Sequence, residues 1–176
     1  MVHGSFTGIR IGISTVKAFK DSLNIKTVGI NSLEGLAYNV ASSGIICSII
    51  DAKKQNVYVE VFENIGGKYK IKRNPSFENI DDLLNELKLE KLENITFVGD
   101  GAANYQEKIL QILPDSIFCL SNQLFARNIG LAALDNVNLE YTTSLEPLYL
   151  RKSQAEQVLC DKSQLNERTS IKNETK

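Results

Sequence analysis

Histidine is nearly absent from this 176-residue chain, which contains only His3. A single histidine cannot supply a His-x-x-x-His metal pair, or a zinc site shared with scattered cysteines. It is also poorly placed to serve as the base of a Ser-His-Asp triad. We therefore expect neither a metal site nor triad chemistry. No catalytic residue and no cofactor are expected either, and His3 itself is expected to be exposed to solvent.

Other scarcities exclude further classes of protein. The three cysteines, Cys47, Cys119 and Cys160, are far apart and odd in number, which predicts reduced core thiols in the cytoplasm. The net charge is −1 and the pI is about 5.9, so the chain has no excess of positive charge for binding nucleic acid unaided. No basic region followed by an apolar one begins the sequence, and no apolar run approaches about 18 residues. Neither secretion nor membrane spanning is expected.

What is present is an ordinary globular composition, with 43% hydrophobic and 23% charged residues. Periodicity predicts helices and strands in a mixed order, with three antiparallel strands in the middle of the chain and an edge strand protected by lysines. Pro75 is expected to end that edge strand. The predicted helices are 7–23, 31–41, 80–87, 104–113 and 122–134, and the predicted strands are 26–30, 44–50, 57–62, 68–72, 94–98 and 117–120, with strand character again at 147–151.

The stretch from His3 to Leu23 combines a glycine-bracketed turn with a helical pattern, for which Thr7 is the predicted N-cap. Ile9, Ile11 and Ile13 alternate as in a strand, but the apolar pattern continues too far for one. Only a narrow strip along this helix is polar, so the helix is expected to be contacted on more than one face. Three interpretations stay open: a core helix, a docking surface, or an anion-binding turn at a helix N-terminus. The turn matches neither Gly-x-x-x-x-Gly-Lys-Ser/Thr nor Gly-x-Gly-x-x-Gly after a strand.

Two aspartates follow predicted buried strands and form a second candidate site. Gly99-Asp100-Gly101 lies at a strand-to-helix junction, and Asp51 ends the strand 44–50. Each is compatible with a phosphate or magnesium turn, or with a tight structural turn in which the aspartate caps a helix. No second carboxylate in a recognisable motif decides between these readings.

Four motifs, in this order and spacing, resemble the TsaB (YeaZ) family from the first residues to about Arg151. They are residues 4–12 (Gly-Ser-Phe-Thr-Gly-Ile-Arg-Ile-Gly), residues 50–53 with 57–59 (Ile-Asp-Ala-Lys and Val-Tyr-Val), residues 99–102 (Gly-Asp-Gly-Ala), and residues 147–151 (Pro-Leu-Tyr-Leu-Arg).

The resemblance implies an α/β fold of the actin-like type (ASKHA, ribonuclease H-like), with mixed sheets flanked by helices. It implies that residues 1–43 are the remainder of an N-terminal ASKHA subdomain and that residues 44–151 form a second subdomain. Residues 152–176 would form a polar C-terminal tail that is frayed or disordered.

By the same resemblance, the chain is expected to be a non-catalytic scaffold subunit in the bacterial formation of threonylcarbamoyladenosine in tRNA. It would pair with TsaD, meet TsaE in a ternary complex, and reach tRNA only indirectly. In the family, the helix after Gly-Ser-Phe-Thr-Gly and the helix after the next strand meet TsaD. The partner-interface residues expected from this are Gly8, Arg10, Gly12, Ile13, Lys17, Leu33, Leu36 and Ala37.

The chain departs from the family pattern at its beginning. Family members start with strands that include an Asp-Thr-Ser turn, and here the sequence starts at the glycine loop, with Val2-His3-Gly4 in place of Gly-Pro-Gly. Without those strands, we expect an exposed sheet edge and one exposed side of the first helix, with reduced stability or self-association. The competing hypotheses are a homodimeric interaction or regulatory protein, and a residual ATPase or glycoprotease-type enzyme.

Overall fold

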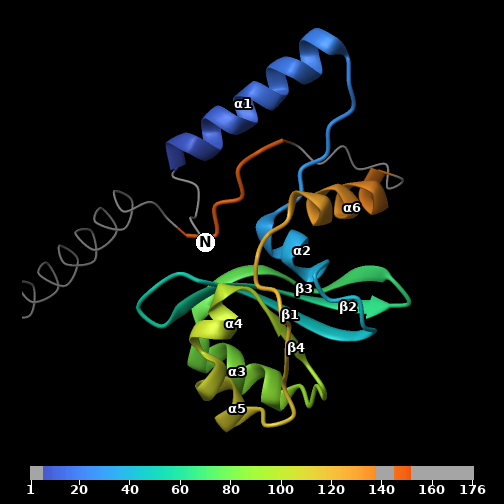
Figure 1. Cartoon of the computed structure of the whole chain (residues 1–176). Helices are drawn as coiled ribbons and strands as arrows, with labels where there is room; N and C mark the ends of the chain where they lie inside the picture. Colours follow the sequence, from blue (N-terminus) through green and yellow to red (C-terminus); the bar gives the residue numbers. More distant parts are fainter. Residues whose placement is uncertain (1–5, 138–144, 152–176) are drawn as a thin grey trace, which may run out of the picture.

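A five-stranded mixed sheet forms the centre of the structure, a computed structural model that describes residues 6–137 and 145–151 (Figure 1). The strand order is β3-β2-β1-β4-β5. β1, β2 and β3 form an antiparallel meander, and β4 and β5 run parallel to β1. The strands are β1 Gly44–Asp51, β2 Asn56–Ile65, β3 Lys68–Asn79, β4 Thr96–Val98 and β5 Ile117–Phe118, and the helices are α1 Phe6–Leu23, α2 Ser32–Ala37, α3 Ile80–Leu89, α4 Asp100–Asn104, α5 Gln106–Ile112 and α6 Ala126–Val137.

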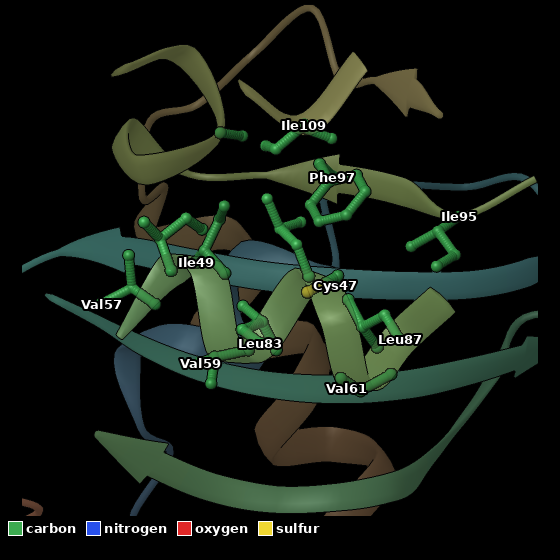
Figure 2. Packing of buried hydrophobic residues seen from close by; sticks show 13 residues of the cluster. Cys47, Ile49, Val57, Val59, Val61, Leu83, Leu87, Ile95, Phe97 and Ile109 are labelled. Carbon is green, nitrogen blue, oxygen red and sulfur yellow. The ribbon is translucent and has the colours of Figure 1, made fainter. Parts of the chain in front are cut away.

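Helices cover both faces of the sheet, which explains the continuous apolar run of β1. Cys47 and Ile49 face one side, where α3 and α5 contribute Leu83, Leu87 and Ile109 to the larger core (Figure 2). Ile46 and Ile50 face the other side, beneath α2. A strand buried on both faces needs apolar residues at successive positions instead of an alternating pattern. The prediction of a mixed α/β sheet flanked by helices is confirmed.

The meander follows the turn chemistry of the sequence. Gly66 and Gly67, both at positive φ, connect β2 to β3 as predicted. The lysine-rich β3 is an edge strand, also as predicted, but it continues through Pro75 to Asn79. The expectation that Pro75 ends the strand was wrong, because an edge strand tolerates a residue that cannot donate to a ladder on its outer side.

The start of α3 shows how local sequence sets a helix boundary. The Asn79 side chain accepts a hydrogen bond from the amide of Asp81 at 2.9 Å. Asp81 and Asp82 lie in the first turn, where negative charge is favoured by the helix dipole. The predicted helix at 80–87 is therefore confirmed.

Several predicted elements differ in the structure. Residues 26–30 and 147–151 form no strand, because an extended segment needs a neighbouring strand to pair with. The helix predicted at 104–113 corresponds to α5, and the short helix α4 precedes it as a separate element. Tyr105 lies between the two, where the backbone leaves the helical region with φ −111°. The last helix begins at Ala126, four residues later than predicted at 122, and the first begins at Phe6, so Thr7 lies inside it and is not its N-cap.

α2 precedes the predicted subdomain boundary at residues 43 and 44, yet it packs on β1 and β2. The division into 1–43 and 44–151 stays a prediction. The predicted exposure of His3, residues 4 and 5 of the glycine loop, and the predicted tail at 152–176 lie outside the described residues.

Candidate functional site

Helix α1 exposes nearly all of its surface. Of residues 7–23, only Ile13 is half-buried and every other residue is exposed. Figure 1 shows α1 set apart from the sheet and joined to α2 by an irregular segment. Most helical stability in proteins comes from packing of an apolar face rather than from helix propensity. The exposed apolar side chains of α1 are therefore a candidate surface for a partner.

These apolar positions form a stripe along α1. Ile9, Gly12, Val16, Phe19 and Leu23 follow one another at alternating steps of three and four residues. Phe19 is 54% exposed and Leu23 is 62% exposed. A 3-4 spacing keeps residues on one side of a helix and is the pattern by which two helices pack along each other.

Gly12 lies at the centre of this stripe with open space around it. A Cβ atom added at Gly12 would meet no other atom within 4 Å. Among the described residues, the glycine is therefore not needed for packing. Its lack of a side chain leaves the helix backbone open to close approach by a partner.

The structure separates the predicted interface residues into two groups. Gly8, Arg10, Gly12, Ile13 and Lys17 all lie on α1, and apart from the half-buried Ile13 they are exposed.

The remaining three, Leu33, Leu36 and Ala37, lie on α2 with relative exposures of 4%, 0% and 0%. They pack on the sheet with Ile46 and Phe62. The apolar face of α2 is used by the core of this chain, so it is not presented to a partner beside α1.

The two aspartate turns meet at the carboxyl ends of β1 and β4. Asp100 Oδ1 accepts a hydrogen bond from the backbone amide of Asp51 at 3.0 Å. Asp100 is the first residue of α4, and Gly99 before it has φ +109°. The structure therefore corrects the capping interpretation: the Asp100 carboxylate accepts from the neighbouring strand, and no side chain of the described residues forms a cap hydrogen bond at the start of α4.

Several described groups donate hydrogen bonds to the Asp51 carboxylate. It accepts from the backbone amide and Nζ of Lys53, both at 2.9 Å, from Asn104 Nδ2 at 3.1 Å and from Tyr105 Oη at 3.2 Å. Burial would raise the pKa of Asp51, but the hydrogen bonds from Lys53 and Tyr105 and the Lys53 charge outweigh it and lower that pKa. The contacts at this carboxylate support a structural role, in which it ties β1 to α4 and α5.

Neither a metal cluster nor a disulfide is present in the part of the chain that the structure describes. Within it, no cluster of three or more His, Cys, Asp or Glu side chains is placed to hold a metal ion. Cys47 and Cys119 are free thiols. Burial raises the pKa of the Cys47 thiol, which therefore stays protonated and inert. Over the same residues, no helix combines the length and the apolar character that crossing a bilayer requires.

One contact at α1 was not predicted from the sequence. Arg10 Nε donates a hydrogen bond to Tyr149 Oη at 2.8 Å, although the two residues are 139 positions apart. Local periodicity carries no signal for such a contact. The only sign was that both residues lie in motifs of the family resemblance.

Comparison with known proteins agrees with this architecture. The family model described as "TsaD: tRNA N6-adenosine threonylcarbamoyltransferase" matches residues 4–171. The chain is 32% identical over 111 residues to the tRNA threonylcarbamoyladenosine biosynthesis protein TsaB of Bacillus subtilis (strain 168), covering 62% of this chain and 48% of that protein. The chain thus spans about half the length of this curated relative.

Two solved structures from Pseudomonas aeruginosa share the fold. One is an uncharacterized protein with similarity to peptidase YEAZ, with a TM-score of 0.62, 20% identity, and coverage of 85% of this chain and 70% of that one. The other is YeaZ, with a TM-score of 0.60, 19% identity, and coverage of 85% and 71%. Both support the actin-like fold. The family model, which matches most of the chain, and the curated relative identify this chain as a member of the TsaB (YeaZ) family, within the group that the TsaD model describes.

Proposed function

We propose that this chain is a non-catalytic scaffold subunit in the biosynthesis of threonylcarbamoyladenosine in tRNA, and that it docks on TsaD through helix α1. The observation that carries this proposal is the exposed apolar stripe of Ile9, Gly12, Val16, Phe19 and Leu23. A partner helix with a complementary stripe would bury these side chains and place its backbone close to Gly12.

The name of the B. subtilis relative supports the proposed role in threonylcarbamoyladenosine biosynthesis. The exposed apolar stripe of α1 supports docking as the way in which the chain acts. These 176 residues contain a single histidine, so they cannot by themselves form a metal site built on two histidines. The Asp51 carboxylate is engaged by Lys53, Asn104 and Tyr105. We infer that chemistry belongs to the partner, that TsaE joins through the ternary complex, and that tRNA is contacted indirectly in the cytoplasm.

The decisive experiment is capture of the cognate TsaD by the tagged chain and by its Gly12→Leu variant. The leucine side chain would fill the space that the partner backbone needs, so capture should be lost. The variant should stay folded, because Gly12 is open to solvent and leucine favours a helix more than glycine does. Circular dichroism and thermal unfolding check this.

Gly130→Leu is the matched control. Gly130 is an exposed glycine of α6 and also has no atom within 4 Å of an added Cβ. This variant should capture TsaD like the wild type. Retained capture by Gly12→Leu would show that α1 is not the docking surface.

Light scattering of the chain with and without TsaD tests the homodimeric alternative. The scaffold role predicts a heterodimer in the mixture. A homodimer that persists with excess TsaD, and that Gly12→Leu dissociates, would assign the stripe to self-association. ATP hydrolysis by the purified chain that Asp100→Ala abolishes would instead support the enzymatic alternative.

A further inference from the structure

The segment from residue 145 to residue 151 forms neither helix nor strand, yet it lies against α1 (Figure 1). It contains the family-like motif Pro-Leu-Tyr-Leu-Arg at 147–151, to which the proposed function gives no role. We call residues 145–151 the strap. Its contacts connect α1 to the sheet.

The first contact joins the strap to α1. Besides its hydrogen bond to Tyr149 Oη, the Arg10 guanidinium lies 5.7 Å from the centre of the Tyr149 ring. This distance is within the range of a cation–π interaction. Arginine suits this double contact better than lysine, because its planar group can donate hydrogen bonds and stack on a ring at the same time.

The second contact joins the strap to the sheet. Two residues after Tyr149, the Arg151 guanidinium lies 5.5 Å from the centre of the Phe77 ring on β3. Phe77 in turn packs against Tyr58 on β2, with ring centres 5.4 Å apart. A chain of ring and guanidinium contacts thus runs from α1 through the strap to β3 and β2.

These contacts have a consequence for docking. α1 is joined to α2 through residues 24–31, a segment without regular structure, so covalent linkage alone leaves the direction of the helix poorly fixed. Binding a helix that samples many directions costs orientational entropy, and holding it in one direction beforehand reduces that cost. A contact between Arg10 and Tyr149 would supply this preorganisation.

We propose that the strap fixes the direction of α1 relative to the sheet and forms one edge of the docking surface. This inference rests on the proposed function for the identity of the partner. Leu148 is 54% exposed and Tyr149 is 42% exposed, so the edge adds apolar area beside the helix. α1 also carries Lys17 and Lys20 against the single acid Asp21, so the partner's apolar surface is expected to be bordered by carboxylates.

Spin-label distance measurements on the chain alone test the orienting role without any partner. One label is placed on α1 at Ser14→Cys, outside the apolar stripe, and one on β3 at Lys70→Cys, with Cys119 and Cys160 replaced by serine. The wild-type strap should give a narrow distance distribution. Tyr149→Ala should broaden it, and Tyr149→Phe should broaden it less, since the ring remains and the hydrogen bond is lost.

Calorimetric titration with TsaD tests the docking role. Tyr149→Phe and Arg10→Lys should each weaken binding by about threefold to tenfold. The fold loss of affinity in the double variant should be smaller than the product of the two single fold losses, since both single changes break the same contact. Leu120→Ala removes an exposed leucine outside α1 and the strap, and should change neither distance nor affinity.

The outcomes distinguish the orienting role of the strap from its docking role, and both from the proposed function. An unchanged distance distribution in Tyr149→Ala would overturn the orienting role. A broadened distribution with unchanged affinity would overturn the docking role of the strap. If the wild-type chain does not bind TsaD, the proposed function fails, while the distance measurement still decides whether the strap orients α1.

Discussion

Asn31 connects the buried carboxylate of Glu60 to the start of helix α2. Its Nδ2 donates to Glu60 Oε2 at 2.9 Å, and its Oδ1 accepts from the backbone amide of Glu34, also at 2.9 Å. Glu60, on β2, is only 1% exposed. Burial raises the pKa of Glu60 to about 7, the Glu34 charge adds to the rise, and the hydrogen bond from Asn31 opposes it. The orientation of the α2 cap is therefore coupled to a carboxyl group that titrates near neutral pH.

This coupling predicts that stability falls as pH rises. The pKa of Glu60 is raised on folding, so the stabilisation is complete below its usual value of 4.5 and is lost as pH rises through about 7. Urea unfolding between pH 5 and pH 8.5 should show a loss of about 2 to 3 kcal/mol in unfolding free energy. Glu60→Gln, which stays neutral, should remove most of this slope.

Some slope should remain in Glu60→Gln, because burial also raises the pKa of Glu34. Glu63→Gln on the same strand is the control and should keep the wild-type profile. A Glu60→Gln protein with the full wild-type slope would show that another group titrates.

Asp51 predicts a pH effect of the opposite sign. Its pKa is lowered on folding, so its stabilisation is present above the usual value of 3.8 and is lost as pH falls through the lowered folded value. Asp51→Ala should cost about 1 to 3 kcal/mol at pH 7, because it leaves Asn104 and Tyr105 without their acceptor. The cost should shrink toward pH 2 in urea unfolding.

Lys53→Met separates the ion pair from the rest of this arrangement. The Lys53 side chain is 82% exposed, so its charge contributes little. The variant should lose much less stability than Asp51→Ala does. A loss as large as that of Asp51→Ala would show that the ion pair, and not the bonds to Asn104 and Tyr105, is the main contribution.

The sheet could be predicted from the sequence because its determinants are local. The apolar run of β1 ends at a polar turn, β2 follows at hairpin distance, and Gly66 and Gly67 mark the next turn. The acidic first turn of α3 likewise marks that helix directly. Such signals depend on neighbours a few residues away, so a single sequence contains them.

The candidate site was only partly predictable because its contacts are distant in sequence. Few positions around α1 are polar, and from this the sequence indicated a helix with more apolar surface than a single packing contact requires. The family resemblance placed Leu36 on a partner surface, whereas its side chain is buried in the core of this chain. Asn136 Nδ2 donates to Glu34 Oε1 at 2.6 Å across 102 positions, which shows that α6 covers α2. Periodicity reveals an apolar face but not the element that covers it.

Gly99 is predicted to be irreplaceable at the turn between β4 and α4. Its φ of +109° is unfavourable for other residues, and an added Cβ would collide with the backbone carbonyl oxygen of Ile49. Gly99→Ala should lower the unfolding free energy by about 3 kcal/mol or more in urea titrations. Gly130→Ala, in an open helical position, should instead raise it by about 0.5 to 1 kcal/mol. Equal effects of the two changes would contradict this account.

Gly35 is predicted to set the distance between α2 and α6. A Cβ at Gly35 would collide with Ile129 Cδ1 and lie 2.7 Å from Leu124 Cδ1. Gly35→Ala should therefore cost about 1 to 3 kcal/mol, although alanine is the better helix former. Both colliding atoms are ends of flexible side chains, so the cost should depend on the partner residue.

Ile129→Val provides the test, because valine lacks Cδ1. In that background Gly35→Ala should cost at least about 0.5 kcal/mol less than in the wild type, as measured by urea unfolding of the four proteins. Additive effects would show that α6 moves away as a unit instead of yielding at Ile129. Since α6 covers α2, and the buried Leu36 lies on that helix, such a movement would also increase exchange of the α2 amides with deuterium. The two explanations are therefore distinguished by a second, independent measurement.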